Sequence, residues 1–293
     1  QNTGVSLRFD TPIRSLGQQG QRYRVELADD RRLLADLVVG ADGAGSFVRT
    51  AAGIETNRWP YNQTAFVTHV QPEEPHCDTA WQRFLTDGPL GMLPLADGRV
   101  SVVWSLADPL ADAARDATDD DLGAMLTAAS DYALGTLGVA GPRGAFPLCA
   151  RHASHYVMPG LALIGDAAHA IVPFYGQGMN CGFEDCAELN RLIATHDHDW
   201  NAIFPAYENA RKPNGDAIAE LSKRNFVEMS DLSGDPRFQL QKKIEAKFSD
   251  QHPGLWTPLY SMVTFSPEVP YSEALRVGDE QKKVMDKIMA LPG

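Results

Sequence analysis

A buried strand in this chain ends at an aspartate, and a glycine-rich loop follows it. Residues 161–164 form a continuous apolar run, Gly165 and Asp166 come next, and residues 173–180 read Pro-Phe-Tyr-Gly-Gln-Gly-Met-Asn. We expect a helix to begin at about Met179, so that its unpaired N–H groups and the positive end of its dipole face the loop. Such a helix start binds anionic groups, and a reduced flavin is one of them. The pattern therefore predicts a site for an anionic group such as a reduced flavin, with an ordinary flexible loop as the alternative.

A second turn of the same kind occurs earlier in the chain. Residues 34–39 are almost continuously apolar, as in a strand covered on both faces, and Gly40-Ala41-Asp42-Gly43 follows. Ligands of α/β sheets bind beyond the strand ends, where glycine lets the backbone approach a phosphate and an aspartate can accept hydrogen bonds from sugar hydroxyls. A tight strand-to-helix turn with Asp42 as a capping residue explains the same residues equally well. Both interpretations stay open for Asp42 and Gly43.

The elements that must hold these turns are predicted from hydrophobic periodicity. Short alternating or buried apolar runs indicate strands, and apolar stripes at helical spacing indicate helices. Ser46 and Thr118 are expected to cap helices, and Pro213 to kink or divide one. We expect strands at residues 5–9, 23–27, 34–39, 64–70, 81–85, 91–95, 100–106 and 161–164, a turn at residues 17–20, and helices at residues 47–52, 119–137, 179–194, 205–229, 237–248 and 279–291. The sequence therefore predicts an α/β fold.

Composition limits the classes of function. The 293 residues carry 26 Lys and Arg against 38 Asp and Glu, a net charge of −12, which disfavours binding to nucleic acid or anionic lipid. No apolar stretch approaches the roughly 18 residues of a membrane span, no signal peptide is visible, and the four cysteines are too scattered for a disulfide scaffold. We interpret the alternating His196 and His198 as part of a solvated loop and predict no metal site. The expected protein is cytoplasmic and binds a small molecule.

Two parts of the sequence resemble known families of flavin enzymes. Gly40-Ala-Asp-Gly43, followed by Gly165-Asp166, resembles the paired fingerprints of single-component flavin-dependent aromatic hydroxylases with the para-hydroxybenzoate hydroxylase fold. The region 165–293, and above all VPFYGQGMNCGFED at residues 172–185, is similar to kynurenine 3-monooxygenase. The region 1–164, with GPLGMLPLADG at residues 88–98, instead resembles ubiquinone-biosynthesis hydroxylases.

The resemblance implies a fold and a division into domains. It implies the C-terminal portion of an FAD-binding monooxygenase fold, with a β-sheet substrate domain and a helical C-terminus. The implied parts are the end of the FAD-binding domain at 1–55, the β-sheet substrate domain at 56–150, the returning FAD-binding segment at 151–195 and the helical region at 196–293. Both families begin with a Gly-x-Gly-x-x-Gly turn that holds the ADP part of FAD, and this sequence contains no such motif. We therefore expect a portion of a larger enzyme, or an incomplete flavin domain.

The resemblance also assigns cofactor-binding residues. Asp166, which follows Gly165, matches the aspartate that binds the ribityl chain of FAD. Asp42 and Gly43 match a fingerprint that contacts both FAD and NADPH. Met179 and Asn180 match the backbone positions beside the pyrimidine ring of the flavin, and Gly165, Gly176 and Gly178 are also assigned to cofactor binding.

The implied reaction is aromatic hydroxylation with FAD and NADPH, in which a flavin C4a-hydroperoxide transfers one oxygen atom of O₂ to the ring. Pro173, Phe174 and Tyr175 are assigned to the reacting face of the flavin, where they would exclude water. Asn225 and Tyr260 match residues that touch the amino-acid group of L-kynurenine, and ordinary packing is the alternative for both. A ubiquinone-pathway phenol hydroxylase is the alternative activity, and a non-catalytic flavoprotein-like fragment is the more distant one.

Overall fold

The computed structural model describes residues 4–76, 78–232 and 234–291, and the chain folds into two compact units. The first unit takes in the chain up to Arg58, Ala150–Glu220 and Ser266–Arg276. The second takes in Trp59–Cys149, Leu221–Phe265 and the chain from Val277. All the residues predicted to bind a cofactor therefore belong to the first unit.

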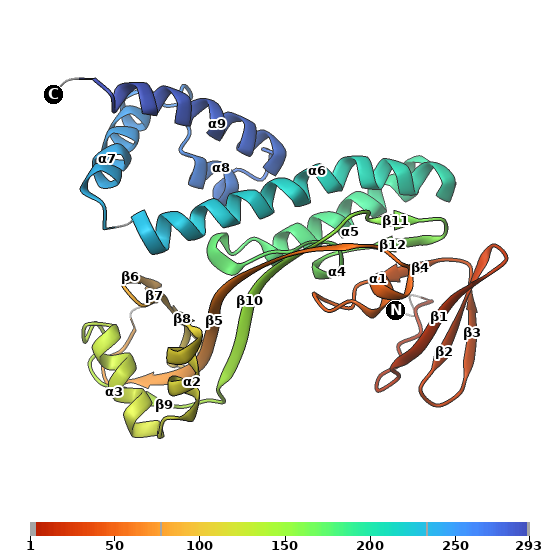
Figure 1. Ribbon diagram of the computed structural model, residues 1–293, viewed down its shortest axis with the longest axis horizontal. Coiled ribbons are helices and arrows are strands. Elements are labelled where there is room, and N and C mark those ends of the chain that lie inside the picture. Colours follow the sequence, from red (N-terminus) through yellow and green to blue (C-terminus); the bar gives the residue numbers. More distant parts are fainter. Residues whose placement is uncertain (1–3, 77, 233, 292–293) are drawn as a thin grey trace. The chain divides into compact units, whose positions relative to one another are not determined.

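The first unit is built on a pair of parallel strands. β4 (Val38–Gly40) pairs with β12 (Leu161–Leu163), and β11 (Val157–Met158) pairs antiparallel with β12 (Figure 1). All three side chains of β12 are completely buried. Because β4 and β12 are parallel, their carboxyl ends meet at the same edge of the sheet. The two predicted ligand turns therefore start side by side.

Helices cover this pair of strands. The helices are α1 (Phe47–Ala51), α4 (Asp166–His169), α5 (Gly178–Thr195) and α6 (Trp200–Val227). α5 and α6 run side by side (Figure 1), and they bury Leu192, Ile203 and Tyr207 in one apolar cluster with β12. Burying an aliphatic side chain of this size contributes about 1.5–3 kcal/mol. The Tyr207 hydroxyl also donates to the Leu163 carbonyl at 2.9 Å, which fixes the helix layer to the end of β12.

A three-stranded antiparallel sheet completes the first unit, and it differs from the prediction. Its strands are β1 (Ile13–Gln19), β2 (Arg22–Leu27) and β3 (Arg32–Ala35). Residues 5–9 were predicted as a strand and are not one, because β1 occupies the position beside β2 and leaves Val5, Leu7 and Phe9 exposed. The alternating apolar and polar residues predicted a strand with one buried face, but the segment that pairs with β2 is β1.

Two boundaries in this sheet were also predicted wrongly. The turn expected at residues 17–20 is confined to its end, since Gly17 belongs to β1 and Gly20, with φ of +64°, begins the turn. The single strand expected at residues 34–39 is divided into β3 and β4, which belong to different sheets. The apolar run therefore contributes to two separate strands, and it leaves Leu34 and Val39 exposed.

The second unit contains one sheet, formed by β5 (Thr56–Pro72), β6 (Trp81–Leu85), β7 (Gly88–Pro94), β8 (Val100–Ala107), β9 (Leu137–Val139) and β10 (Gly144–Ala153). The strand order is β10-β5-β8-β7-β6, with β9 beside β5. Phe66 of β5 lies opposite Trp104 of β8, and both side chains are buried. The helices α2 (Asp108–Asp116) and α3 (Asp119–Ala129) pack Ala114 and Leu122 into the same apolar cluster.

The helix predicted at residues 119–137 ends early. Thr118 caps it as expected, but α3 stops at Ala129, and Asp131 and Tyr132 have φ of +57° and +58°, which a helix cannot continue. Leu137 is buried instead as part of β9, which pairs with β5. The apolar residues that predicted one long helix therefore belong partly to α3 and partly to β9. The elements α2 and β10 were not predicted.

The C-terminal elements are mostly helical, as predicted. They are the π-helical turn η2 (Glu228–Leu232), α7 (Pro236–Gln251), α8 (Leu259–Phe265) and α9 (Tyr271–Ile288). α9 begins eight residues before the expected Asp279. Pro213 does not divide α6, which is helical on both sides of it, because Ile218 and Leu221 beyond the proline are completely buried and their burial offsets the lost hydrogen bond.

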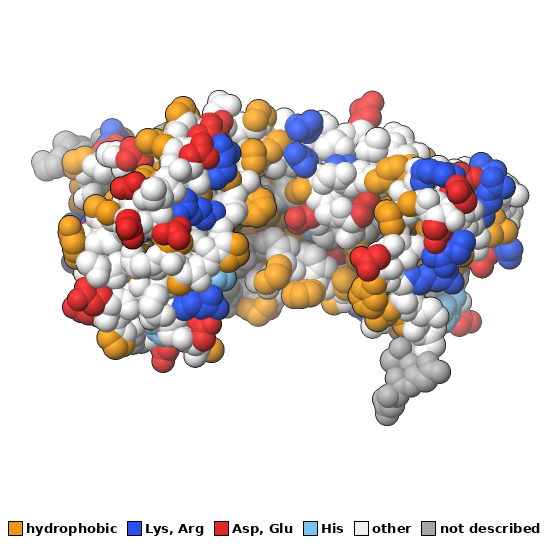
Figure 2. Space-filling model, turned by 90° about the horizontal axis from the view of Figure 1, so that it is seen from below, with side chains coloured by type: hydrophobic (Ala, Val, Ile, Leu, Met, Phe, Trp, Pro, Cys, Tyr) orange, Lys and Arg blue, Asp and Glu red, His pale blue; other side chains and the backbone are white. Residues whose placement is uncertain are grey.

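The surface carries mixed charges. On the face shown in Figure 2, Lys and Arg side chains lie among Asp and Glu side chains. Within the described ranges, no helix is both long enough and apolar enough to cross a bilayer.

Candidate functional site

Asp166 is an exposed carboxylate directly after a buried strand. Gly165 joins β12 to α4 with φ of +58° and ψ of −143°, a conformation that residues with a side chain rarely adopt, so this turn requires glycine. The Asp166 carboxylate makes no hydrogen bond or ion pair to any residue that the structure describes. A free carboxylate on a fixed turn can accept hydrogen bonds from the hydroxyl groups of a ligand.

Asp42, the other predicted aspartate, is engaged within the chain. One carboxylate oxygen accepts from the Ser46 hydroxyl, and the other accepts from the Val48 N–H at 2.9 Å. Ser46 in turn caps α1 by accepting from the Arg49 N–H, as predicted. Burial opposes ionisation of Asp42, but these hydrogen bonds outweigh it and lower the pKa of the carboxyl group. The structure thus shows the capping role, and a contact of Asp42 or Gly43 with a cofactor stays a prediction.

Arg49, which the sequence analysis missed, joins the two turns. Its buried guanidinium donates to the Ala44 carbonyl at 2.9 Å and to the Ala167 carbonyl at 2.6 Å. Ala44 follows Gly43 and Ala167 follows Asp166, so one side chain fixes both loops at the sheet edge. A single basic residue in a short helix gives no sequence signal for this role.

The glycine-rich loop forms a short 3₁₀ turn and then the start of α5. The turn η1 (Pro173–Tyr175) ends at Gly176, whose φ of +68° favours glycine. α5 begins at Gly178, and no side chain caps it at Gln177. The first intrahelical hydrogen bond is donated by the Cys181 N–H to the Gln177 carbonyl, so the N–H groups of residues 178–180 have no partner within the helix and are available to a ligand. The positive end of the helix dipole favours an electron-rich group at this position.

Side chains of the loop differ in exposure. Phe174 and Tyr175 are each 8% exposed, whereas Pro173 is exposed and Met179 is 75% exposed. Asn180 is exposed too, and its amide donates to Gln177 at 2.9 Å. Of the three residues predicted to border the flavin ring, Pro173 therefore presents its side chain at the surface, while Phe174 and Tyr175 anchor the loop.

A buried network of charges ties the Asp166 turn to the helices. Asp185 of α5 is completely buried and accepts hydrogen bonds from the Gly165 N–H at 2.8 Å, from His169 Nε2 at 2.6 Å and from Arg211 Nε at 2.6 Å. Arg211 also donates to Glu184 at 2.8 Å. Burial raises the pKa of Asp185, but His169 and Arg211 outweigh it, so the pKa of this carboxyl group is lowered.

The His169–Asp185 pair makes the stability of the fold depend on pH. Burial alone lowers the pKa of His169, but the hydrogen bond to Asp185 outweighs it and raises the pKa to about 10, against 6.5 for an ordinary histidine. The stabilisation is complete below about pH 6.5 and is lost as the pH rises through about 10, with a total of the order of a few kcal/mol. Urea unfolding between pH 6.5 and 10 should show this loss in the wild type, and His169→Gln should reduce it. The same pH dependence in both proteins would contradict the assignment.

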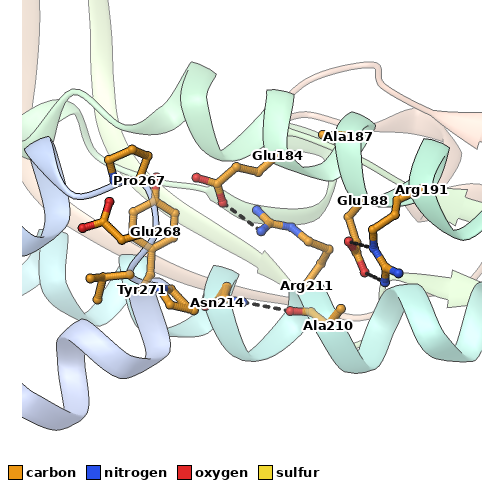
Figure 3. Close-up of a pocket in the computed structure, with 12 residues that line it drawn as sticks. Glu184, Ala187, Glu188, Arg191, Ala210, Arg211, Asn214, Pro267, Glu268 and Tyr271 are labelled. Carbon is orange, nitrogen blue, oxygen red and sulfur yellow. Dashed lines mark hydrogen bonds and ion pairs between the residues drawn. The ribbon is translucent and has the colours of Figure 1, made fainter.

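A cavity of about 390 Å³ lies between α5, α6 and the segment before α9. Figure 3 shows Glu184 of α5 and Arg211 of α6 pointing toward one another at this cavity, and Glu188 paired with Arg191 on α5. Tyr271, at the start of α9, also lines it and donates its hydroxyl to Gln177 at 3.2 Å. The described residues around the cavity include none of those predicted to contact a flavin. Its charged side chains are largely paired with one another.

Asn225 and Tyr260 belong to the second unit. Asn225 is 8% exposed near the end of α6, and its amide donates to Met229 Sδ at 3.5 Å. Tyr260 of α8 is 49% exposed, and its ring meets that of Phe265 edge-to-face with centroids 6.2 Å apart. Substrate contact stays a prediction for both residues.

Comparisons with known proteins agree with the flavin interpretation. Residues 1–222 match a family described as FAD binding domain. A stretch of 133 residues, 45% of this chain, is 59% identical to 30% of the kynurenine 3-monooxygenase of Christiangramia forsetii. A stretch of 187 residues, 63% of this chain, is 40% identical to 47% of the 3-demethoxyubiquinol 3-hydroxylase of Escherichia coli. The matched stretches thus span less than half of either curated relative.

The fold is also found among solved structures. The anhydrotetracycline hydroxylase OxyS from Streptomyces rimosus is similar over 89% of this chain and 53% of its own, with a TM-score of 0.68 and 22% identity. The predicted α/β architecture with β-sheets and C-terminal helices is therefore confirmed. Because the family match covers far more than half of its residues, the chain belongs to the FAD-binding domain family and has the fold of the flavin-dependent aromatic hydroxylases.

Proposed function

We propose that this chain holds the ribityl chain and the isoalloxazine ring of FAD in an NADPH-using aromatic hydroxylase. One observation carries the proposal: within a single unit, the free carboxylate of Asp166 and the uncapped N-terminus of α5 belong to segments that pack together. A Cβ added to Gly182 of α5 would lie 3.4 Å from the Cα of Gly165. The identity of 59% with a kynurenine 3-monooxygenase supports the same assignment.

The residues present fit a flavin. Asp166 has acceptor capacity that the described chain does not use, which suits the ribityl hydroxyls, and the N–H groups of Met179 and Asn180 suit the electron-rich pyrimidine ring. When bound, FAD supplies the redox chemistry that connects NADPH and O₂ to ring hydroxylation. The chain itself binds and orients the cofactor and excludes water with the loop around Pro173. Gly43, beside the capping residue Asp42, would contribute to the FAD and NADPH contacts.

L-Kynurenine is the substrate that the relatives favour most. Asn225 and Tyr260 then bind its amino-acid group, and each offers a hydrogen-bonding group suited to a charged head. A second candidate is favoured by a different observation, since the Escherichia coli 3-demethoxyubiquinol 3-hydroxylase matches a longer part of this chain, 63% against 45%. That candidate implies a ubiquinone-precursor phenol as the substrate.

The two substrates are distinguished by NADPH consumption and product analysis of the FAD-loaded protein. We expect L-kynurenine to stimulate NADPH oxidation and to yield a product that has gained one oxygen atom. Tyr260→Phe should raise KM for kynurenine about two- to tenfold, because it removes one hydrogen bond to the amino-acid group, and should leave flavin content unchanged. Tyr132→Phe, a change at an exposed tyrosine elsewhere in the second unit, should alter neither quantity.

Other results would contradict the kynurenine assignment. Stimulation by a prenylated phenol, no response to kynurenine and no effect of Tyr260→Phe would favour the second candidate. No stimulation of FAD-loaded protein by either substrate, with flavin bound, would favour a non-catalytic flavoprotein.

A further inference from the structure

Asp185 is a completely buried carboxylate with three hydrogen-bond donors around it. One oxygen accepts from both the Gly165 N–H and His169 Nε2, and the other accepts from Arg211 Nε. A buried ion is costly unless it is paired and hydrogen-bonded, and here two cationic side chains compensate its charge. The third donor is different, because it is a backbone N–H of the turn that leads to Asp166.

The geometry of α5 explains why the carboxylate reaches this N–H. Gly182 and Asp185 are three residues apart and therefore share one face of the helix. Gly182 has no side chain, and a Cβ there would already lie 3.4 Å from the Cα of Gly165. The helix and the turn are thus close enough for Asp185 to bond Gly165 directly. Because Gly165 has φ of +58°, its conformation is intrinsically one of several open to glycine, and a hydrogen bond selects among them.

We propose that Asp185 is a positioning residue for the flavin, which fixes the Gly165 turn and thereby the direction of the Asp166 carboxylate. This inference rests on the proposed function, since it assigns Asp166 to the ribityl chain. Asp185 does not itself contact the flavin. It joins the two segments that do, because it lies on the helix whose N-terminus faces the pyrimidine ring and bonds the turn that carries Asp166.

Asp185→Asn tests the proposal with little change in shape. An asparagine side chain has one acceptor oxygen and one donor nitrogen, so it cannot accept from both the Gly165 N–H and Arg211. We expect about a tenfold loss of affinity for FMN and FAD, which is what one hydrogen bond involving a charged group is worth. At saturating flavin, the visible circular dichroism of the bound flavin should also differ from the wild type, because the ribityl chain is held differently.

Glu184→Gln is the matched control. Glu184 precedes Asp185 on α5 and bonds the same Arg211, but its side chain is 43% exposed and makes no hydrogen bond to Gly165. The change removes the same charge and disturbs the same arginine. We expect flavin affinity within about twofold of the wild type, with an unchanged visible circular dichroism spectrum.

A measurement on the wild type keeps the test decisive if Asp185→Asn does not fold. Hydrogen exchange of the flavin-free chain, resolved to the Gly165 amide by fragmentation, should show protection before any flavin is added. An unprotected Gly165 amide that becomes protected only with flavin would overturn the proposal, as would an Asp185→Asn protein with wild-type affinity and spectrum. If the wild type binds flavin and Asp166→Ala does not, while Asp185→Asn behaves as the wild type, the positioning role fails and the proposed function stands. If the wild type binds neither FMN nor FAD, the proposed function itself fails.

Discussion

Asp166→Ala is expected to weaken flavin binding about tenfold to a hundredfold. The carboxylate has no partner among the described residues and is exposed, so the change removes an acceptor that only a ligand uses. A hydrogen bond to a charged group is worth about 1.5–3 kcal/mol, which gives this range of affinity. Because nothing in the fold depends on that carboxylate, the free energy of unfolding of the flavin-free chain should change by less than about 0.5 kcal/mol.

A flavin fluorescence titration of wild type and variant measures the effect. Asp197→Asn is the control, since it removes one negative charge from the same unit, at the far end of α5, where Asp197 is fully exposed. It should leave the affinity unchanged, which separates a direct contact from a general effect of net charge. Equal affinities of wild type and Asp166→Ala would remove Asp166 from the site.

Arg211→Met is expected to lower the free energy of unfolding by about 3 kcal/mol, the lower part of the range for breaking a buried ion pair. The Arg211 side chain is 7% exposed and bonds Asp185, Glu184 and the Cys181 carbonyl. Methionine fills a similar volume but leaves Asp185 with one cation, His169, in place of two. The remaining pair explains why the expected cost lies at the lower end.

Urea unfolding gives the comparison, with Arg191→Met as its control. Arg191 pairs with Glu188 one turn away, but its side chain is 58% exposed, and exposed pairs contribute only about 0–1 kcal/mol. Destabilisation by Arg191→Met as large as that by Arg211→Met would show that the buried network contributes no more to the free energy of unfolding than an exposed ion pair does.

Local signals made much of the site predictable. The run at residues 161–164 became β12, Ser46 became a helix cap, and the helix expected from Met179 begins one residue earlier, at Gly178. These features depend on near neighbours: an apolar run, a hydroxyl before a helix, and glycines where the helix starts. Each leaves a pattern that can be read without knowing what lies opposite in the fold.

The rest depends on contacts between distant residues. Arg49 reaches Ala167 across 118 positions, and Asp185 reaches Gly165 across 20. Nothing near Asp185 in the sequence distinguishes it from the partly exposed Glu184 and Glu188 on the same helix. The same limit explains the strand wrongly predicted at residues 5–9, since alternation shows which residues share a face and not which strand will pair. It also explains Asp42, whose capping role is visible only in the hydrogen bonds that it accepts.

The central claim is that a flavin binds between the Asp166 turn and the start of α5, and a crystal structure of the chain with bound FAD or FMN tests it most directly. We predict the Asp166 carboxylate and an N–H of Met179 or Asn180 within hydrogen-bonding distance of the flavin, about 3 Å. A flavin bound with its ring more than about 6 Å from residues 173–180, beyond any direct hydrogen bond, would contradict the claim.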